Sequence, residues 1–321
     1  MTPTLSLAIC TYNPRADHLE RTLRSLQKQT LPMDQWELLL VDNASTNGVV
    51  ETMDLSWHPQ ARVVKESRIG LTMARLRAID ETATPYLVYA DDDNEMAPDY
   101  LATMIRLAEQ HPTLGVIGAG RIVPDFEEAP APELMPYVPM VTLREVAADQ
   151  WSNDPTDLAI PWGAGMMVLR EVAAHYLESL LKDPTKQGLD RTGTSLDSCG
   201  DEQFSWVACE LGMGKGIFVD LYLVHLIGKN RVQKEYLLRL AEAHTFSKSM
   251  LTHLHGGRVR VPKDPPTMRK VMEQLFKLRL SEFVNELHRL LDLRALPELE
   301  RTFNTAKRAG IMRFHRTVGN G

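Results

Sequence analysis

An apolar run of strand length near the middle of the chain ends in three consecutive carboxylates. Residues Leu87 to Ala90 fit a buried strand, and Asp91, Asp92 and Asp93 follow it directly. Three adjacent acids repel one another, so the pattern favours a positive charge close by. A hard divalent cation such as Mg2+ or Mn2+ prefers oxygen ligands and could hold a diphosphate there as a leaving group. The alternative is a solvated acidic turn, because short acidic motifs also arise by chance.

Strand and helix patterns alternate along the first 120 residues. The expected strands cover 5–10, 37–41, 62–65, 86–90 and 116–119, and helices are expected to begin at Asn13–Pro14, at Gly70 and at Pro98. This alternation predicts an α/β fold with a doubly wound, mainly parallel sheet. Ligands of such sheets bind beyond the carboxyl ends of the strands. Three of these ends carry polar residues, namely Thr11, Asp42 and the acidic triplet.

The second half of the chain is less regular. We expect a loop over 125–139, a glycine-punctuated strand over 162–168, a helix over 170–181, a polar loop over 183–199, a helix over 200–211 and a strand over 216–221. After His225 the pattern is helical, with breaks at 256–257 and 262–266. This division predicts a catalytic domain over 1–255 and a helical, basic extension over 256–321.

Charge is unevenly distributed along the 321 residues, whose net charge is -6. Residues 256–321 hold 14 Lys and Arg against 7 Asp and Glu, which leaves -13 for the preceding 255 residues. A basic tail suits an anionic surface, either lipid or nucleic acid, although a solvated helix face is the simpler explanation. Residues Met268 to Leu291 combine apolar spacing with Lys and Arg, as an amphipathic helix does. We expect no nucleic acid as partner, and a peripheral anionic membrane or a second copy of the chain as candidates.

The cysteine and hydropathy patterns bear on location. The three cysteines have no metal or disulfide spacing, which suits a reducing compartment. Neither a signal peptide nor an apolar run long enough to span a bilayer is evident. We therefore expect a cytoplasmic protein. The alternative is a peripheral location at the inner face of the membrane.

The loop after the first strand excludes two common ways of binding phosphate. Dinucleotide-binding folds carry G-x-G-x-x-G there, and P-loops carry G-x-x-x-x-G-K-[ST]. This chain has Thr11-Tyr12-Asn13-Pro14-Arg15 instead. A diphosphate held through a cation at the acidic triplet remains open.

Five segments, taken in order, resemble family 2 glycosyltransferases of the GT-A fold. The resemblance covers roughly Leu5 to Tyr236 and implies an α/β fold with a Rossmann-like nucleotide-binding half. It also implies inverting, metal-dependent transfer from a nucleoside-diphosphate sugar to a hydroxyl acceptor, such as a glycan or lipid-linked sugar, in bacterial-type polysaccharide or glycoconjugate synthesis. The cofactor would be Mn2+ or Mg2+. The five segments are Leu7–Asn13, Leu39–Ser45, Gly70–Arg75, the triplet with Pro98-Asp99 beyond it, and Gly200–Phe204.

The same resemblance implies a role for each matching residue. Glu202, or Asp201, would be the base that activates the acceptor, and Trp162 and Gly163 would line the acceptor side. The metal would lie at Asp93 and His225. The nucleotide would contact Thr11, Asn13, Asp42, Arg75, Asp91 and Asp92.

Each of these residues also has a simpler explanation. Asp42 could form a turn, and Arg75 could pair at the surface with Asp80 or Glu81. His225, which the pattern puts after the last sheet strand, could be an ordinary core histidine. The acids at 201–202 could merely favour the helix dipole, and the glycines of 162–168 could serve sheet packing.

The order of the two acids leaves the choice of base open. Relatives usually have Glu-Asp where this chain has Asp201-Glu202, and the second residue is commonly the base. That position points to Glu202, while Asp201 stays an alternative. A second departure is Leu76, where many relatives have Asn.

Two other functions fit parts of the pattern. A sugar-1-phosphate nucleotidyltransferase shares the nucleotide-binding sheet, but usually shows a Gly- and Arg-rich loop after the first strand. A non-catalytic protein that binds nucleotide sugars would not need acids at both the metal and the base positions.

Overall fold

The computed structural model describes residues 3–261 and 297–319. Its contacts divide the chain into two units, Met1–Leu237 and Leu238–Gly321, which are described separately here. This division falls earlier than the boundary at residue 255 that the sequence suggests. The amphipathic segment from Met268 to Leu291 lies outside the described residues.

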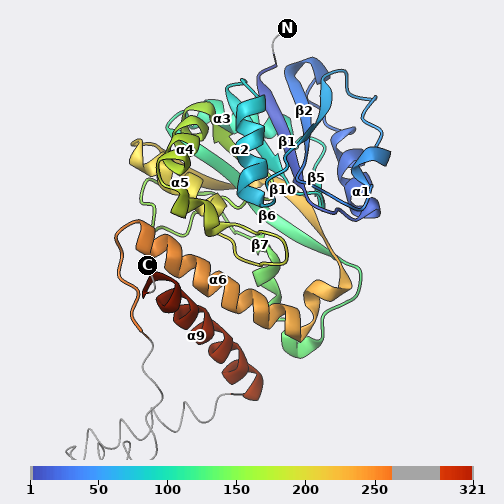
Figure 1. Cartoon of the computed structure of the whole chain (residues 1–321). Helices are drawn as coiled ribbons and strands as arrows, with labels where there is room; N and C mark the ends of the chain where they lie inside the picture. Colours follow the sequence, from blue (N-terminus) through green and yellow to red (C-terminus); the bar gives the residue numbers. More distant parts are fainter. Residues whose placement is uncertain (1–2, 262–296, 320–321) are drawn as a thin grey trace, which may run out of the picture. The chain divides into compact units, whose positions relative to one another are not determined.

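The first unit is built on one mixed sheet (Figure 1). Its order is β3-β2-β1-β4-β9-β6-β10-β5. β1 is parallel to β2 and β4, β2 to β3, and β6 to β10, whereas β9 runs antiparallel between β4 and β6. The prediction of a mainly parallel sheet is confirmed for the long pairings, whereas the short strands β5, β7 and β8 also pair antiparallel. The strands are β1 (Leu5–Thr11), β2 (Trp36–Asp42), β3 (Ala61–Lys65), β4 (Tyr86–Ala90), β5 (Asn94–Met96), β6 (Leu114–Phe126), β7 (Arg144–Glu145), β8 (Gln150–Ser152), β9 (Met166–Leu169) and β10 (Gly214–Ile227).

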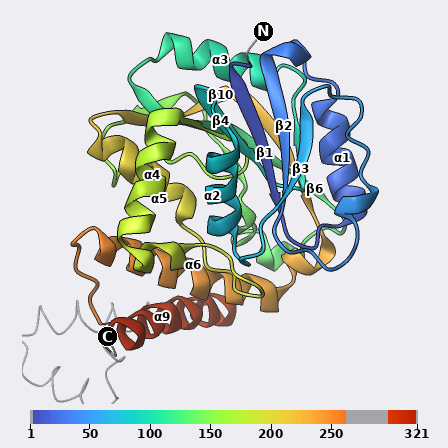
Figure 2. The same ribbon diagram turned by 45° about the horizontal axis from the view of Figure 1, so that its top comes forward.

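Helices cover both faces of this sheet, as in a doubly wound fold. α1 and α3 share one apolar core with β1 and β2, while α2, α4 and α5 form the second core on the opposite face. Figure 2 shows α1 and α2 on opposite sides of β1 and β2. The cores form because strand residues alternate between faces and each helix buries one apolar stripe. The helices are α1 (Ala16–Leu26), α2 (Leu71–Glu81), α3 (Tyr100–Gln110), α4 (Arg170–Lys182) and α5 (Gly200–Glu210).

The register of the parallel strands brings their polar ends to one edge. Thr11 pairs with Asp42 across β1 and β2, and Ile9 pairs with Ala90 across β1 and β4. The acidic triplet, which begins after Ala90, therefore lies at the same edge as Thr11. The sequence prediction that these strand ends meet is confirmed.

Two strands are longer than the sequence predicts. β6 continues to Phe126 and β10 to Ile227, so that His225 lies inside β10 and not after it. The expected loop at 125–139 correspondingly begins two residues late. The extension of β6 includes Pro124, although proline argues against a central strand. Here β7 pairs only with Arg121 and Ile122, so the following part of β6 has that side unpaired and accommodates the proline.

The strand expected over 162–168 is wrong in its first half. β9 contains only Met166 to Leu169, and Gly165 has a φ of +74°, a left-handed conformation that breaks the strand. Tyr100 donates its hydroxyl hydrogen to the Gly165 carbonyl at 2.8 Å. The polar loop expected over 183–199 also contains structure, a 3₁₀ helix η5 (Pro184–Leu189) followed by buried Asp190.

The second unit contains α9 (Glu298–Gly319) and most of α6 (Lys234–Leu254). The Arg313 guanidinium lies 3.8 Å from the centre of the Phe246 ring, and Phe303 and Phe314 are buried. Gly310 allows the two backbones to approach, because a Cβ there would lie 2.3 Å from the Glu242 carbonyl oxygen. Part of the basic tail is thus a packed helix. Across 3–261 and 297–319, no helix has both the length and the apolar character needed to cross a bilayer.

We expect Gly310→Ala to destabilise the second unit by about 1–3 kcal/mol, the usual cost of overpacking. Alanine normally favours a helix over glycine by roughly 0.5–1 kcal/mol, so the sign of the effect is diagnostic. Gly319→Ala is the matched control, because a Cβ there meets nothing within 4 Å. Urea unfolding and hydrogen exchange of α9 amides measure the difference. Equal stability of the two variants would contradict the close packing.

Candidate active site

A cavity of about 300 Å³ opens at the carboxyl edge of the sheet in the first unit. Its walls come from the ends of β1 and β4, the helices α2 and α5, the 162–165 turn and β10. Eight of the residues singled out from the sequence line it: Thr11, Arg75, Asp91, Asp92, Asp93, Gly163, Asp201 and His225.

Two of the predicted nucleotide-binding residues do not line this cavity. Asp42 is buried and accepts the backbone N–H of Ser45 at 2.9 Å, which is the turn that the simpler interpretation predicts. Asn13 has a φ of +51°, and its side-chain oxygen accepts the N–H groups of Thr46 and Asn47 at 2.7 and 3.2 Å. Both side chains therefore hold the loops around the cavity.

The acidic triplet is crowded and partly buried. Burial and the charge of Asp93 raise the pKa of Asp92 to about 7. The same two causes raise the pKa of Asp91. The Thr11 hydroxyl donates a hydrogen bond to Asp92. Because both shifts reflect burial and neighbouring negative charge, a bound cation would relieve them.

Asp93 meets two groups from the end of β10 and the turn after it. β5 pairs with β10 so that Asn94 lies opposite His225, and this pairing brings His225 Nε2 to 3.3 Å from Asp93 Oδ2. Arg231, in the 3₁₀ helix η6 (Lys229–Val232), lies 2.7 Å from the same oxygen. Burial alone would raise the pKa of Asp93, but the charges of His225 and Arg231 together hold it well below its usual range. Sequence reasoning missed Arg231, whose only signal is a cation six residues after the histidine.

The donor atoms beside Asp93 fit a divalent cation only in part. A carboxylate oxygen and an imidazole nitrogen converge there, and Mn2+ accepts both kinds of ligand. Within 3–261 and 297–319, no group of three His, Cys, Asp or Glu side chains is arranged to hold a metal ion. Cations that serve phosphate transfer commonly take only one or two protein carboxylates, the rest coming from substrate phosphates and water. Asp93 and His225 would therefore hold a metal together with a diphosphate.

Arg75 forms a buried ion pair that the sequence did not predict. Its Nη1 lies 2.9 Å from Asp190 Oδ2, and each side chain is 4% exposed. Asp190 also accepts the Thr72 hydroxyl and the Gly200 backbone N–H, each at 3.1 Å. The surface pairing considered for Arg75 is therefore wrong. Asp190 joins α2 to the first residue of α5, and nothing in its local sequence marks it.

We expect Asp190→Asn to lower the free energy of unfolding by about 3 kcal/mol, because it leaves the Arg75 charge buried without its partner. Replacing both residues, as in Asp190→Asn with Arg75→Met, should cost clearly less than the single change. Urea unfolding measures both values. Asp80→Asn, on the exposed side of α2, is the control and should stay within about 0.5 kcal/mol of wild type. Additive losses in the double variant would show that the two side chains do not form the pair.

The structure separates the two candidate bases. Asp201 lines the cavity, and its Oδ2 accepts the Gly163 backbone N–H at 3.0 Å. Glu202 does not line it, and its Oε1 lies 3.7 Å from the Cys199 sulfur. Gly163 itself leaves no room for a side chain, since a Cβ would lie 2.3 Å from Arg75 Nη2.

Trp162, expected on the acceptor side, contacts an arginine and is absent from the cavity wall. The Arg144 guanidinium lies 3.5 Å from the centre of its ring. Arg144 also donates to the Ile160 carbonyl at 2.8 Å, and burial lowers the pKa of this arginine to about 10. The tryptophan thus packs beside the cavity.

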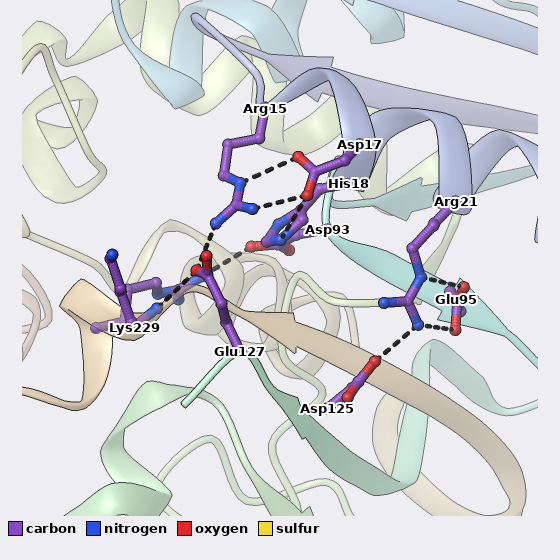
Figure 3. A network of polar contacts seen from close by, with 10 residues as sticks. Arg15, Asp17, His18, Arg21, Asp93, Glu95, Asp125, Glu127 and Lys229 are labelled. Atoms are coloured by element: carbon purple, nitrogen blue, oxygen red, sulfur yellow. Dashed lines mark hydrogen bonds and ion pairs between the residues drawn. The ribbon is translucent and has the colours of Figure 1, made fainter. Parts of the chain in front are cut away.

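A second hollow adjoins the first and shares Asp92, Asp93 and Arg231 with it. Figure 3 shows the polar network around this hollow, in which Arg15 contacts Asp17 and Glu127. The Glu127 carboxylate also accepts the Lys229 backbone N–H at 3.0 Å. These contacts anchor the turn that carries Arg231.

Comparison with known proteins shows the family of this chain. The model of the family described as "Glycosyl transferase family 2" matches residues 6–177, which is more than half of the chain. The chain is a family 2 glycosyltransferase. This family 2 glycosyltransferase has the GT-A fold that its sequence predicts.

Individual relatives are distant and align over short segments. A putative glycosyltransferase of Bacillus subtilis, EpsH, is 27% identical over 33% of this chain and 31% of its own length. The putative teichuronic acid biosynthesis glycosyltransferase TuaG of the same organism is 29% identical over 31% of this chain and 39% of its own length. The chain thus spans well under half of these curated relatives. A mannosyltransferase of Pyrobaculum calidifontis, solved with GDP-Man and Mn2+, covers 98% of this chain and 87% of its own at 18% identity, with a TM-score of 0.57. At 18% sequence identity, this similarity shows a shared fold only.

Proposed function

We propose that this protein is an inverting, metal-dependent glycosyltransferase that moves a sugar from a nucleoside-diphosphate sugar to a hydroxyl acceptor. One observation carries the proposal: a single cavity collects Thr11, the acidic triplet and Asp201 from three separate segments of the chain. The strand ends would bind the nucleotide, the cation site would bind the diphosphate, and the base would deprotonate the acceptor hydroxyl.

In this proposal the side chains divide the work as follows. Thr11 and Asp91 face the nucleotide, and buried Arg75 presents positive charge to the same cavity. Asp93 and His225 would hold Mn2+ or Mg2+, which neutralises the charge that develops on the departing diphosphate. Asp201 removes the proton of the acceptor hydroxyl. The acceptor oxygen attacks the anomeric carbon on the face opposite the diphosphate, and the bond between that carbon and the diphosphate oxygen breaks. No covalent intermediate with the protein is needed.

We assign the base to Asp201 in preference to Glu202. A general base must reach the proton that it removes, and Asp201 faces the cavity. The carboxylate accepts the N–H groups of Gly163 and Glu202, which fix its orientation. A carboxylate has about four acceptor positions, so it can still receive the acceptor hydroxyl.

The two rival functions are less well supported. A nucleotidyltransferase would need a Gly- and Arg-rich phosphate loop after β1, where this chain has Thr11 to Arg15. A non-catalytic binding protein would have no use for an oriented carboxylate in the same cavity as the triplet. Release of a nucleoside diphosphate, and not of pyrophosphate, distinguishes transfer from nucleotidyl transfer.

The experiment is a thermal-shift screen of UDP-, GDP- and dTDP-sugars with Mn2+. A ligand that binds only the folded state raises its stability by RT ln(1 + [L]/Kd), so a fitting donor raises the melting temperature. GDP-sugars and Mn2+ come first, because a solved protein of the same fold binds both. No shift with any donor would contradict the proposal.

The biological setting remains a sequence-based proposal. A role in polysaccharide or glycoconjugate synthesis agrees with the printed name of one relative. An anionic membrane and a second copy of the chain stay candidate partners.

A further inference from the structure

One arginine contacts both atoms that the proposed metal would use. Arg231 Nη1 lies 2.7 Å from Asp93 Oδ2 and 3.0 Å from His225 Nε2. The Asp93 oxygen and the His225 nitrogen are themselves 3.3 Å apart. The three atoms therefore form a compact triangle, with the cationic group at one corner.

The chemistry of the triangle makes Arg231 a competitor of the metal. A guanidinium can only donate hydrogen bonds, so its contact with His225 is favourable when Nε2 carries a lone pair. A neutral imidazole nitrogen with a lone pair is also the form that binds metal ions. Asp93 thus directs toward Arg231 a lone pair that a divalent cation would need, and the neutral form of His225 does the same through Nε2.

We propose that Arg231 is a diphosphate-binding residue that holds Asp93 and His225 until metal and diphosphate bind together. This inference rests on the metal site of the proposed function. Two cations at contact distance repel each other, so a metal on Asp93 requires the guanidinium to move away. Arg231 lines both hollows, so each of them borders the displaced guanidinium's path. A diphosphate beside the metal gives the displaced guanidinium a planar, bidentate partner.

The sparse ligand set has a further consequence for binding. Metal alone would meet two protein ligands and a competing cation. A nucleoside diphosphate supplies the missing oxygen ligands and also accepts Arg231. Metal and nucleoside diphosphate should therefore bind cooperatively, and each should raise the affinity of the other by the same factor.

Mn2+ binding, followed by electron paramagnetic resonance, tests the inference without turnover. Arg231→Gln keeps a side chain of similar length but removes the competing charge. We expect this variant to bind Mn2+ alone about tenfold more tightly than wild type, a common size for coupling between sites. At saturating Mn2+, we expect the same variant to bind UDP, GDP or dTDP, whichever wild type binds, about tenfold more weakly. A residue that merely stabilised the fold would weaken both.

Matched variants separate the explanations. Arg231→Lys retains the positive charge and should keep the weak binding of Mn2+ alone. Lys234→Gln removes an exposed cation that lies three residues further along the chain and lines neither hollow, and it should leave both affinities at wild-type values. Circular dichroism confirms that each variant is folded.

Two results would overturn the inference. Unchanged or weaker binding of Mn2+ alone to Arg231→Gln would show that the arginine does not compete with the metal. Unchanged affinity for the nucleoside diphosphate would show that it does not bind the phosphates. If Asp93→Asn still binds Mn2+, the proposed metal site itself is wrong, and the proposed function fails together with this inference.

Discussion

Asp93→Asn is expected to lower glycosyl transfer by about 10³-fold or more, since a metal ion contributes several kcal/mol to the stabilisation of developing charge. The asparagine keeps the size of the side chain but loses the charge that would hold the cation. Binding of the donor nucleotide in Mn2+ should weaken in parallel. The Asp93 side chain is 15% exposed. The fold should nevertheless survive its substitution, because Asp93 lies at the rim of the sheet and outside both apolar cores. Initial rates and calorimetric titration measure the two effects.

Asp125→Asn is the control for this variant. Asp125 pairs with Arg21 at 2.8 Å, and it lines neither hollow. Its substitution should leave transfer within a factor of about two of wild type, as expected for a surface position. An active Asp93→Asn protein would refute the metal site.

Asp201→Asn should lower kcat by about 10²- to 10⁴-fold, the usual contribution of a general base. The donor should bind with nearly unchanged affinity, because the amide oxygen can still accept the Gly163 N–H and keep the turn in place. Glu202→Gln is the matched control, since it makes the equivalent change one residue further along α5. Rapid-quench kinetics with a saturating donor separates kcat from binding.

Comparing the two variants shows whether Asp201 or Glu202 is the base. A large loss in Glu202→Gln with an active Asp201→Asn would restore the order that the sequence resemblance implies. Full activity of both variants would show that the base lies elsewhere in the cavity.

The sequence predicts which residues lie at the carboxyl edge of the sheet better than it predicts the long-range contacts that these residues make. The strand ends at Thr11, Asp42 and Asp91 follow from local apolar runs, because runs of about four to eight apolar residues bounded by polar ones have the length of buried strands. The register of parallel strands then brings these ends together without further information. For this reason, much of the cavity wall could be named in advance.

Long-range partners could not be found this way. Asp190 lies in a polar loop and Arg231 follows a strand, and neither position differs locally from a solvated surface residue. Their importance comes from Arg75, which is 115 residues away from Asp190, and from Asp93, which is 138 residues away from Arg231. Only the folded chain reveals such pairs.

The errors in the sheet have a local cause. Pro124 and Gly165 are residues of types that normally end or interrupt strands. In the structure Pro124 continues β6 along an unpaired side, whereas Gly165 turns the chain before β9. Knowledge of the neighbouring strands would have been required to distinguish the two.

The most direct test of the central claim is the release of nucleoside diphosphate by the wild-type protein in Mn2+ and in excess EDTA. The donor is the nucleotide sugar that the thermal-shift screen identifies, and a broad mixture of glycan and lipid-linked hydroxyl acceptors is supplied. We predict release in Mn2+, its loss in EDTA, and its recovery when Mn2+ is restored in excess. Release that continues undiminished in EDTA would contradict a mechanism in which a cation at Asp93 and His225 holds the leaving diphosphate.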